Sequence, residues 1–115
     1  MPHITLEYSQ NMGPDLDLPE IITNLHDALA AQGVDKGRIK TRAIPLLHSV
    51  VGQHEANEGQ MAHVTLLLLE GRDIPTRQAY GKALHDVLST AVKAEFPDCA
   101  VTLEVREMVK DTYIL

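Results

Sequence analysis

The sequence PHITL at residues 2–6 returns almost unchanged as AHVTL at residues 62–66. In both copies polar and apolar residues alternate, as they do in a β-strand with one buried face. The copies differ in their first residue, because Pro2 directly follows Met1 whereas Ala62 lies in the middle of the chain. We therefore interpret the chain as one structural unit used twice, in which only the first copy can expose a free amine.

A helix is expected after each copy. The segments Asp17-Leu18-Pro19 and Asp73-Ile74-Pro75 both combine an aspartate suited to an N-cap with a proline suited to the first helical turn. Apolar residues then recur at helical spacing in each half. Gly33 and Pro97 indicate where the two helices end.

An alternating segment follows each expected helix. The first begins near Arg38 and ends or bends at Pro45, and its residues Ile39–Arg42 correspond to Leu103–Arg106 near the end of the chain. Each half thus has the order strand, helix, strand, and a right-handed crossover makes its two strands parallel. The predicted fold is α+β, with duplicated β-α-β units forming a four-stranded sheet that carries two helices on one face.

The chain length suits a single domain with one modest core. We predict one domain at residues 1–115, with repeat halves at residues 1–47 and 61–108 joined by a polar loop. The run Leu66–Leu69 places apolar side chains on both faces of the third strand, whereas the helices cover only one face. We expect further copies of the chain to cover the other face in a homo-oligomer.

Composition limits the partners. The formal net charge is -6, and the chain has three Tyr, one Phe and no Trp. Nucleic-acid binding needs concentrated basic charge and, for single strands, aromatic rings that stack on bases, so this class is disfavoured. No segment approaches the roughly 20 apolar residues of a bilayer-spanning helix, and residues 1–4 do not resemble a signal peptide. We expect a cytoplasmic protein that binds neither nucleic acid nor membrane.

Pro2 carries the most unusual chemistry in the sequence. If Met1 is removed, which a small following residue generally permits, Pro2 presents a secondary amine at the end of a strand. A solvated proline amine is mostly protonated at neutral pH and is a poor base. Burial and neighbouring cations lower the pKa of such an amine towards the working pH, where a general base is most effective. Pro2 is therefore our candidate catalytic residue.

Lys40, Arg42 and Arg72 are the candidate cations. Guanidinium groups pair bidentately with carboxylates, and all three cations could stabilise an enolate as its charge develops. This pattern favours a small-molecule substrate that bears several carboxylates. The alternative for each cation is a solvated surface charge, and for Arg77 a surface ion pair is the favoured interpretation.

The six histidines show no spacing typical of metal ligands. His3 and His63 occupy equivalent places in the repeat, as do His26 and His85, which indicates duplication. Only His48 or His54, in the polar loop, could meet a substrate or an ion. We predict neither a metal nor a cofactor.

Several segments together resemble the tautomerase superfamily, and within it the 5-carboxymethyl-2-hydroxymuconate isomerases. They occur in the same order and at similar spacing over most of the chain, and comprise Met1-Pro2-His3, Asp17–Pro19, Ile39–Arg42, His63–Leu66, Gly71-Arg72 and Arg77-Gln78. The resemblance implies the fold of that superfamily, a homotrimer, and an amino-terminal proline as the catalytic base. It also implies 5-carboxymethyl-2-hydroxymuconate as substrate, in the bacterial breakdown of homoprotocatechuate. Lys40 stands where these isomerases are expected to have an arginine, and lysine keeps the charge but loses the bidentate fork.

Two alternatives remain at this point. One is a related tautomerase acting on another enol, such as phenylenolpyruvate or 2-hydroxymuconate. The other is a non-catalytic oligomeric binding protein with the same fold, because an attached Met1 would make the Pro2 nitrogen a tertiary amide that cannot act as a base.

Overall fold

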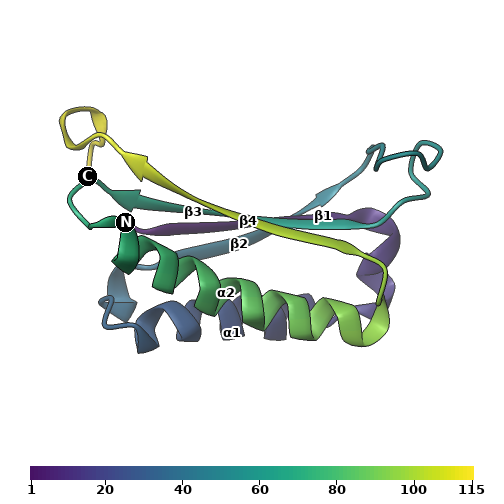
Figure 1. Cartoon of the computed structure of the whole chain (residues 1–115), viewed down its shortest axis with the longest axis horizontal. Coiled ribbons are helices and arrows are strands. Elements are labelled where there is room, and N and C mark those ends of the chain that lie inside the picture. The colour runs from purple at the N-terminus through teal and green to yellow at the C-terminus, as the bar shows by residue number, and fades with distance from the viewer.

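The computed structural model describes all 115 residues. A four-stranded sheet in the order β2-β1-β3-β4 carries two helices side by side on one face, as Figure 1 shows. This architecture confirms the predicted fold class. The elements are β1 (His3–Ser9), η1 (Gln10–Asp15), α1 (Leu18–Ala31), η2 (Lys36–Arg38), β2 (Lys40–Leu46), β3 (Met61–Leu69), α2 (Ile74–Glu95), β4 (Ala100–Met108) and η3 (Lys110–Thr112), of which the three η elements are short 3-10 helices.

The two copies of the repeated pentapeptide pair with each other at the centre of the sheet. β1 and β3 are antiparallel, with Thr5 opposite Thr65 and His3 opposite Leu67. The outer strands β2 and β4 each run parallel to the inner strand of their own half. Residues at equivalent repeat positions are therefore related by an approximate two-fold axis between Thr5 and Thr65.

The strand register corrects one correspondence drawn from the sequence. His3 lies opposite Lys40, whereas its counterpart His63 lies opposite Thr102. Arg42 therefore corresponds to Glu104 and not to Arg106, so the match of Ile39–Arg42 with Leu103–Arg106 is displaced by two residues. Because side chains alternate with a period of two, this displacement leaves every residue on its expected face.

The predicted starts of both helices are confirmed. Asp17 Oδ1 accepts a hydrogen bond from the Glu20 N–H at 3.1 Å, and Asp73 Oδ1 accepts one from the Thr76 N–H at 2.9 Å. Hydrogen bonds from Thr76 hold the pKa of the Asp73 carboxyl below its usual value. Gly33, with a φ of +97°, follows the end of α1, where a side chain would be strained.

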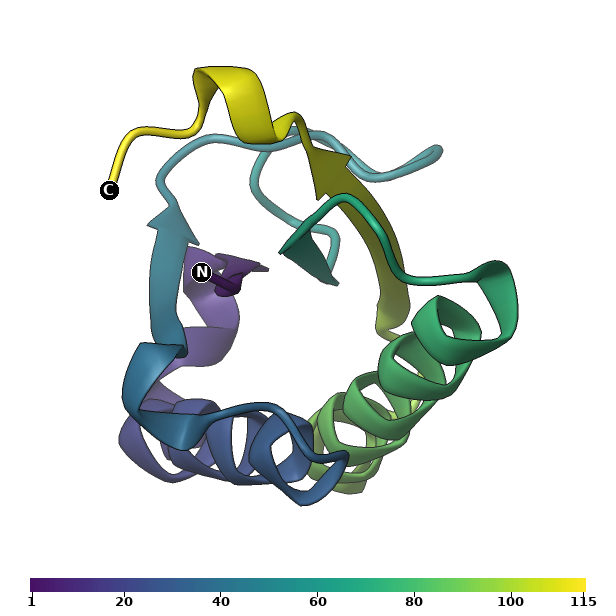
Figure 2. The same cartoon turned by 90° about the vertical axis from the view of Figure 1, so that its left-hand side faces the viewer.

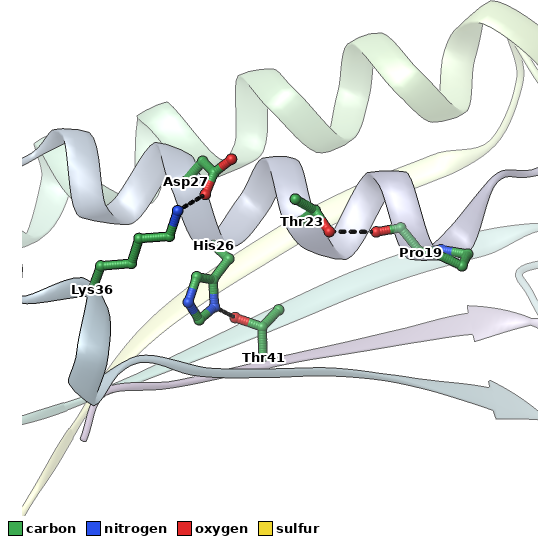
Figure 3. Close-up of polar contacts among 6 residues, drawn as sticks. All are labelled: Pro19, Thr23, His26, Asp27, Lys36 and Thr41. Atoms are coloured by element: carbon green, nitrogen blue, oxygen red, sulfur yellow. Dashed lines mark hydrogen bonds and ion pairs between the residues drawn. The ribbon is translucent and has the colours of Figure 1, made fainter.

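A histidine ties each helix to the outer strand of its half. His26 Nδ1 on α1 lies 2.8 Å from Thr41 Oγ1 on β2, as Figure 3 shows. The figure also shows Lys36 Nζ in an ion pair with Asp27 Oδ1, for which the distance is 2.9 Å. On α2, His85 Nε2 donates to the Val101 carbonyl oxygen at 3.1 Å. These two repeat-related histidines therefore hold helices against the sheet.

The hydrophobic core lies between the helices and the sheet. It is built almost entirely from aliphatic side chains, as the scarcity of aromatic residues requires. Its fully buried members include Ile4, Leu6, Leu25, Leu29, Val64, Leu66, Leu68, Leu84 and Leu88. Neither helix is both long enough and apolar enough to cross a lipid bilayer.

The face of the sheet away from the helices is more polar than the leucine run suggests. Leu66 and Leu68 belong to the core, and only Leu67 and Leu69 of that run face outward. By alternation, the remaining strands present mostly polar residues on this face, namely His3, Thr5, Glu7, Lys40, Arg42, Thr102, Glu104 and Arg106. The expected need to cover an apolar face therefore applies to only part of β3.

The second strand differs from the prediction at both ends. It starts at Lys40, because Arg38 belongs to the 3-10 turn before it. Pro45 lies within the strand, opposite Tyr8. A proline is tolerated there because β2 is an edge strand with a neighbour on one side only.

Gly81 allows α2 to approach β4 closely. A Cβ atom at this position would lie 2.9 Å from Val105 Cγ2 and 3.3 Å from Leu103 Cδ2. We expect Gly81→Ala to lower the free energy of unfolding by up to about 2 kcal/mol, because an overpacking cost of about 1–3 kcal/mol outweighs the roughly 1 kcal/mol gain in helix propensity. Denaturant unfolding at fixed protein concentration measures this change.

The matched control is Lys82→Ala, at the exposed next position of the same helix. It should change the free energy of unfolding by less than about 0.5 kcal/mol. A Gly81→Ala chain at least as stable as the parent would contradict the close-approach argument.

Candidate functional site

A cavity of about 230 Å³ opens at the end of the sheet where β1 begins and β3 ends. The amino terminus lies at this end, which faces the viewer in Figure 2. The cavity is lined by Met1, Pro2, Val34, Asp35, Arg38, Leu69 and Arg72. Its wall therefore combines the amino-terminal residues with two arginines and one carboxylate.

Backbone hydrogen bonds fix the amino terminus at the cavity. The Lys40 N–H donates to the Pro2 carbonyl oxygen at 3.1 Å, which continues the β1–β2 pairing beyond His3. The Met1 α-amine donates to the Arg38 carbonyl oxygen, also at 3.1 Å. Pro2 itself is buried. The segment is thus an ordered part of the cavity wall.

Arg38 reaches the cavity from the turn η2. Asp35 caps this turn through its Oδ1, which accepts from the Gly37 N–H at 3.1 Å, while its Oδ2 lies 3.6 Å from Arg38 Nε. Both side chains of this ion pair are largely exposed. Because such exposed pairs are weak, the Arg38 guanidinium can exchange Asp35 for an anionic ligand at little cost.

Arg72 is held more firmly, from the turn between β3 and α2. Gly71 makes this turn with a φ of +125°, a conformation that favours glycine. The Arg72 guanidinium carbon lies 5.7 Å from the centroid of the Tyr80 ring, within cation–π range. Arg77 Nε donates to the Arg72 carbonyl oxygen at 3.2 Å, and Arg77 also pairs with Glu107 at 3.4 Å. As predicted, Arg77 forms an ion pair.

The electrostatic field at the cavity disfavours a protonated amine. Burial, and then the charges of Lys40 and Arg38, lower the pKa of the Met1 α-amine. Burial also lowers the pKa of His3, with smaller contributions from the amino-terminal ammonium, Arg42 and Lys40. The local field is thus positive although the chain as a whole is acidic.

Comparison with known proteins now decides the family. The model of the 5-carboxymethyl-2-hydroxymuconate isomerase family matches residues 2–114. The chain belongs to this family. It is 29% identical over 113 residues to a 5-carboxymethyl-2-hydroxymuconate Delta-isomerase of Escherichia coli, covering 94% of this chain and 87% of that relative. The family resemblance read from the sequence is confirmed, and the chain is an isomerase.

Solved structures agree with this assignment. A 5-carboxymethyl-2-hydroxymuconate isomerase from Deinococcus radiodurans R1 superposes with a TM-score of 0.85 at 27% identity, covering 99% of this chain and 87% of that one. A fused 4-OT described as a symmetric trimer has a TM-score of 0.76 at 20% identity, covering 98% of this chain and 90% of that one. The second likeness shows the shared tautomerase fold alone.

In this isomerase the cavity brings together two of the four predicted site residues. Pro2 and Arg72 both line it. Lys40 and Arg42 do not line the cavity. They project instead from the open face of the sheet, which is the face away from the helices. Lys40 is still close enough for its charge to act on both the Met1 amine and His3. Arg42 Nη1 lies 3.1 Å from His3 Nδ1.

Arg38 is the cavity residue that the sequence analysis missed, because it was placed at the start of a strand. The available signal was the segment Asp35-Lys36-Gly37-Arg38, in which an aspartate two residues before a glycine is typical of a capped turn. The loop histidines lie elsewhere. The loop that carries them is at the opposite end of the sheet in Figure 1, where His48 Nδ1 accepts from Asn57 Nδ2 at 3.2 Å.

Proposed function

We propose that this isomerase moves a proton within 5-carboxymethyl-2-hydroxymuconate without a cofactor, and that Pro2 is its general base. The observation that supports this most directly is the cavity that places Pro2 beside Arg38 and Arg72. The substrate is taken from the names of the family and of the Escherichia coli relative. A role in the breakdown of homoprotocatechuate and a cytoplasmic location stay predictions.

The base requires removal of Met1, because the Pro2 nitrogen is otherwise an amide. Met1 itself lines the cavity, so its loss both frees the amine and enlarges the space for a substrate. The α-amine of Met1 has a lowered pKa at the mouth of this site. Pro2 is more deeply buried than Met1, and Arg38 and Arg72 line the same cavity. A free Pro2 amine is therefore expected to have a lowered pKa, which increases its unprotonated fraction at neutral pH.

The reaction needs only one proton to move. Pro2 takes the proton from the 2-hydroxyl group, and the resulting dienolate carries negative charge on O2, C3 and C5. Return of the proton to C5 produces the 2-oxo isomer, in which one double bond remains between C3 and C4. Because the proton taken from oxygen is returned to carbon, the step balances without an oxidant or reductant.

The cations match the charge of this substrate, which carries three carboxylates. Arg38 and Arg72 are positioned to pair with carboxylates inside the cavity and to stabilise the dienolate. Lys40 and Arg42, on the adjoining open face of the sheet, are assigned to a carboxylate that extends beyond the cavity. Because Arg38 lines the cavity, we add it to the substrate-binding residues proposed from the sequence.

We also propose a homotrimer. The support is the shared fold with fused 4-OT chains that are described as trimers, together with apolar side chains left exposed near the end of β2 and in the loop after it. These are Ile44, Leu47 and Val50. Light scattering of the purified chain distinguishes a trimer from a dimer or hexamer.

Substituting the proposed base gives the first test. We expect Pro2→Ala to lower kcat/KM for 5-carboxymethyl-2-hydroxymuconate by about 10²–10⁴-fold, the usual contribution of a general base. Loss of the dienol ultraviolet absorbance follows the reaction, and the same assay with phenylenolpyruvate and 2-hydroxymuconate tests the alternative substrates. Pro14→Ala, in η1, is the control and should retain the parental rate. Met1 is also removed before an alanine, so this variant keeps a primary α-amine. Equal rates would therefore rule out a need for the proline ring, and the next test decides whether the free amine is the base.

Processing of the amino terminus gives a second test. We expect the intact mass of the active chain to be lower than that of the full sequence by one methionine residue. A form that retains Met1 should be inactive, because its Pro2 nitrogen is an amide. Mass spectrometry of the most active fraction measures this directly, and full activity with Met1 still attached would contradict the mechanism.

The charge of Arg38 gives a pH-dependent test. Arg38 lowers the pKa of an amine at this end of the chain, so Arg38→Gln should raise the pKa of the Pro2 amine. A larger fraction of the base is then protonated at a given pH. The acid limb of the pH profile of kcat/KM should therefore move to higher pH. Lys36→Gln is the matched control, since Lys36 lies in the same turn but points to Asp27, as Figure 3 shows. An acid limb unmoved by Arg38→Gln would refute the proposed effect of this charge.

A further inference from the structure

His3 connects Arg42, a proposed substrate-binding residue, with the carboxy-terminal tail, which the proposed reaction does not use. Its imidazole Nδ1 lies 3.1 Å from Arg42 Nη1 on β2, and its Nε2 lies 2.8 Å from the Tyr113 hydroxyl in the carboxy-terminal tail. The His3 and Tyr113 rings also meet edge to face, with centroids 5.9 Å apart. His3 immediately follows Pro2, and its contacts lie on the face of the sheet away from the helices, next to the cavity that Pro2 lines.

Hydrogen-bond chemistry assigns the tautomer of His3. A guanidinium group has donors and no acceptor, so Nδ1 must accept from Arg42. The ring proton of neutral His3 therefore resides on Nε2, which donates to the Tyr113 oxygen. A proton on Nδ1 would face the Arg42 N–H and break this contact. Burial, and then the positive charges of the amino terminus, Arg42 and Lys40, lower the pKa of His3 and so also favour its neutral form.

The carboxy-terminal tail that carries Tyr113 is anchored next to Arg72. The Lys110 N–H donates to Glu70 Oε1 at 2.8 Å, and the Gly71 N–H donates to Glu107 Oε2 at 3.3 Å. Figure 2 shows the tail passing from the end of β4 across the end of the sheet above the amino terminus. The tail thus joins the turn before Arg72 to the strand after Pro2.

We infer that His3 is a positioning residue for Arg42, and that Tyr113 fixes the His3 tautomer which makes this possible. With one N–H of Arg42 committed to His3, the guanidinium is held over the sheet with its other donors available to a carboxylate. The Tyr113 oxygen accepts a hydrogen bond from Nε2–H and so stabilises the tautomer in which Nδ1 is the acceptor. This inference rests on the proposed function for the carboxylate-binding role of Arg42, whereas the tautomer of His3 does not depend on it.

The substrate-binding part is tested by a double-mutant cycle. We expect Tyr113→Phe to raise KM about three- to tenfold with little change in kcat, which corresponds to the loss of one net hydrogen bond. In an Arg42→Met background the same substitution should raise KM no further, because its effect passes through Arg42. An equal rise in KM in both backgrounds, or no rise in either, overturns the inference.

Tyr8→Phe is the matched control, because it also removes a tyrosine hydroxyl from the chain. Tyr8 lies at the far end of β1, opposite Pro45 and Ala62, and its hydroxyl makes no hydrogen bond. It should leave KM unchanged in both backgrounds. A KM rise like that of Tyr113→Phe would mean that the effect is not specific to Tyr113, and would overturn the inference.

The tautomer is tested without any substrate. Nitrogen-15 NMR of the imidazole rings, with the His3 signals identified by their absence in His3→Gln, should show at neutral pH a protonated Nε2 and an unprotonated Nδ1. A protonated Nδ1 overturns the assignment. If the chain without Met1 turns over none of the enols, the proposed function fails together with the carboxylate-binding role, whereas the NMR result still decides the tautomer and the Tyr113 contact.

Discussion

The structure depends on the pairing of the first strand with neighbours on both of its sides. β1 is an inner strand, parallel to β2 and antiparallel to β3. An amino-terminal segment paired on one side only would be prone to fraying, whereas this one is hydrogen-bonded on both sides and buries Ile4 and Leu6 in the core. The pairing reaches Pro2, whose carbonyl accepts from Lys40. It therefore fixes the start of the chain between the turn that carries Arg38 and the turn that carries Arg72.

The distribution of charge follows from that placement. A net charge of -6 would suggest a protein that repels anions. The cavity nevertheless has two arginines against one aspartate, and Lys40 adds its charge from the neighbouring strand. Because exposed charges separated by more than about 8–10 Å are largely screened at physiological salt, these near cations decide the field at the amine. The same cations that would suit a carboxylate substrate disfavour protonation of the amino-terminal amine.

Local sequence patterns predicted the elements and their faces well, because capping and alternation are properties of neighbouring residues. The aspartate caps, the buried face of β1 and the four-strand arrangement could all be read in this way. Patterns of period two could not place Arg38, because this residue lies in the turn before β2. The direction of a side chain in a turn does not follow the alternation of the strand. They also suggested a largely apolar outward face of the sheet. The strands beside β3 instead present mostly polar side chains on that face. The contact between His3 and Tyr113 spans 110 positions and left no local signal.

The repeat explains why the chain has one such site and not two. The Pro2 counterpart Ala62 is buried inside continuous chain, so its nitrogen is always an amide. At that end Ser9 Oγ accepts from the Met61 N–H at 2.8 Å, a contact that closes the strand pair. The cavity there, bordered by residues such as Asn11 and Asn57, has no charged residue in its lining. Duplication supplied the same scaffold at both ends of the sheet, but the proposed chemistry needs a chain terminus as well as cations, and only the end that holds Pro2 combines the two.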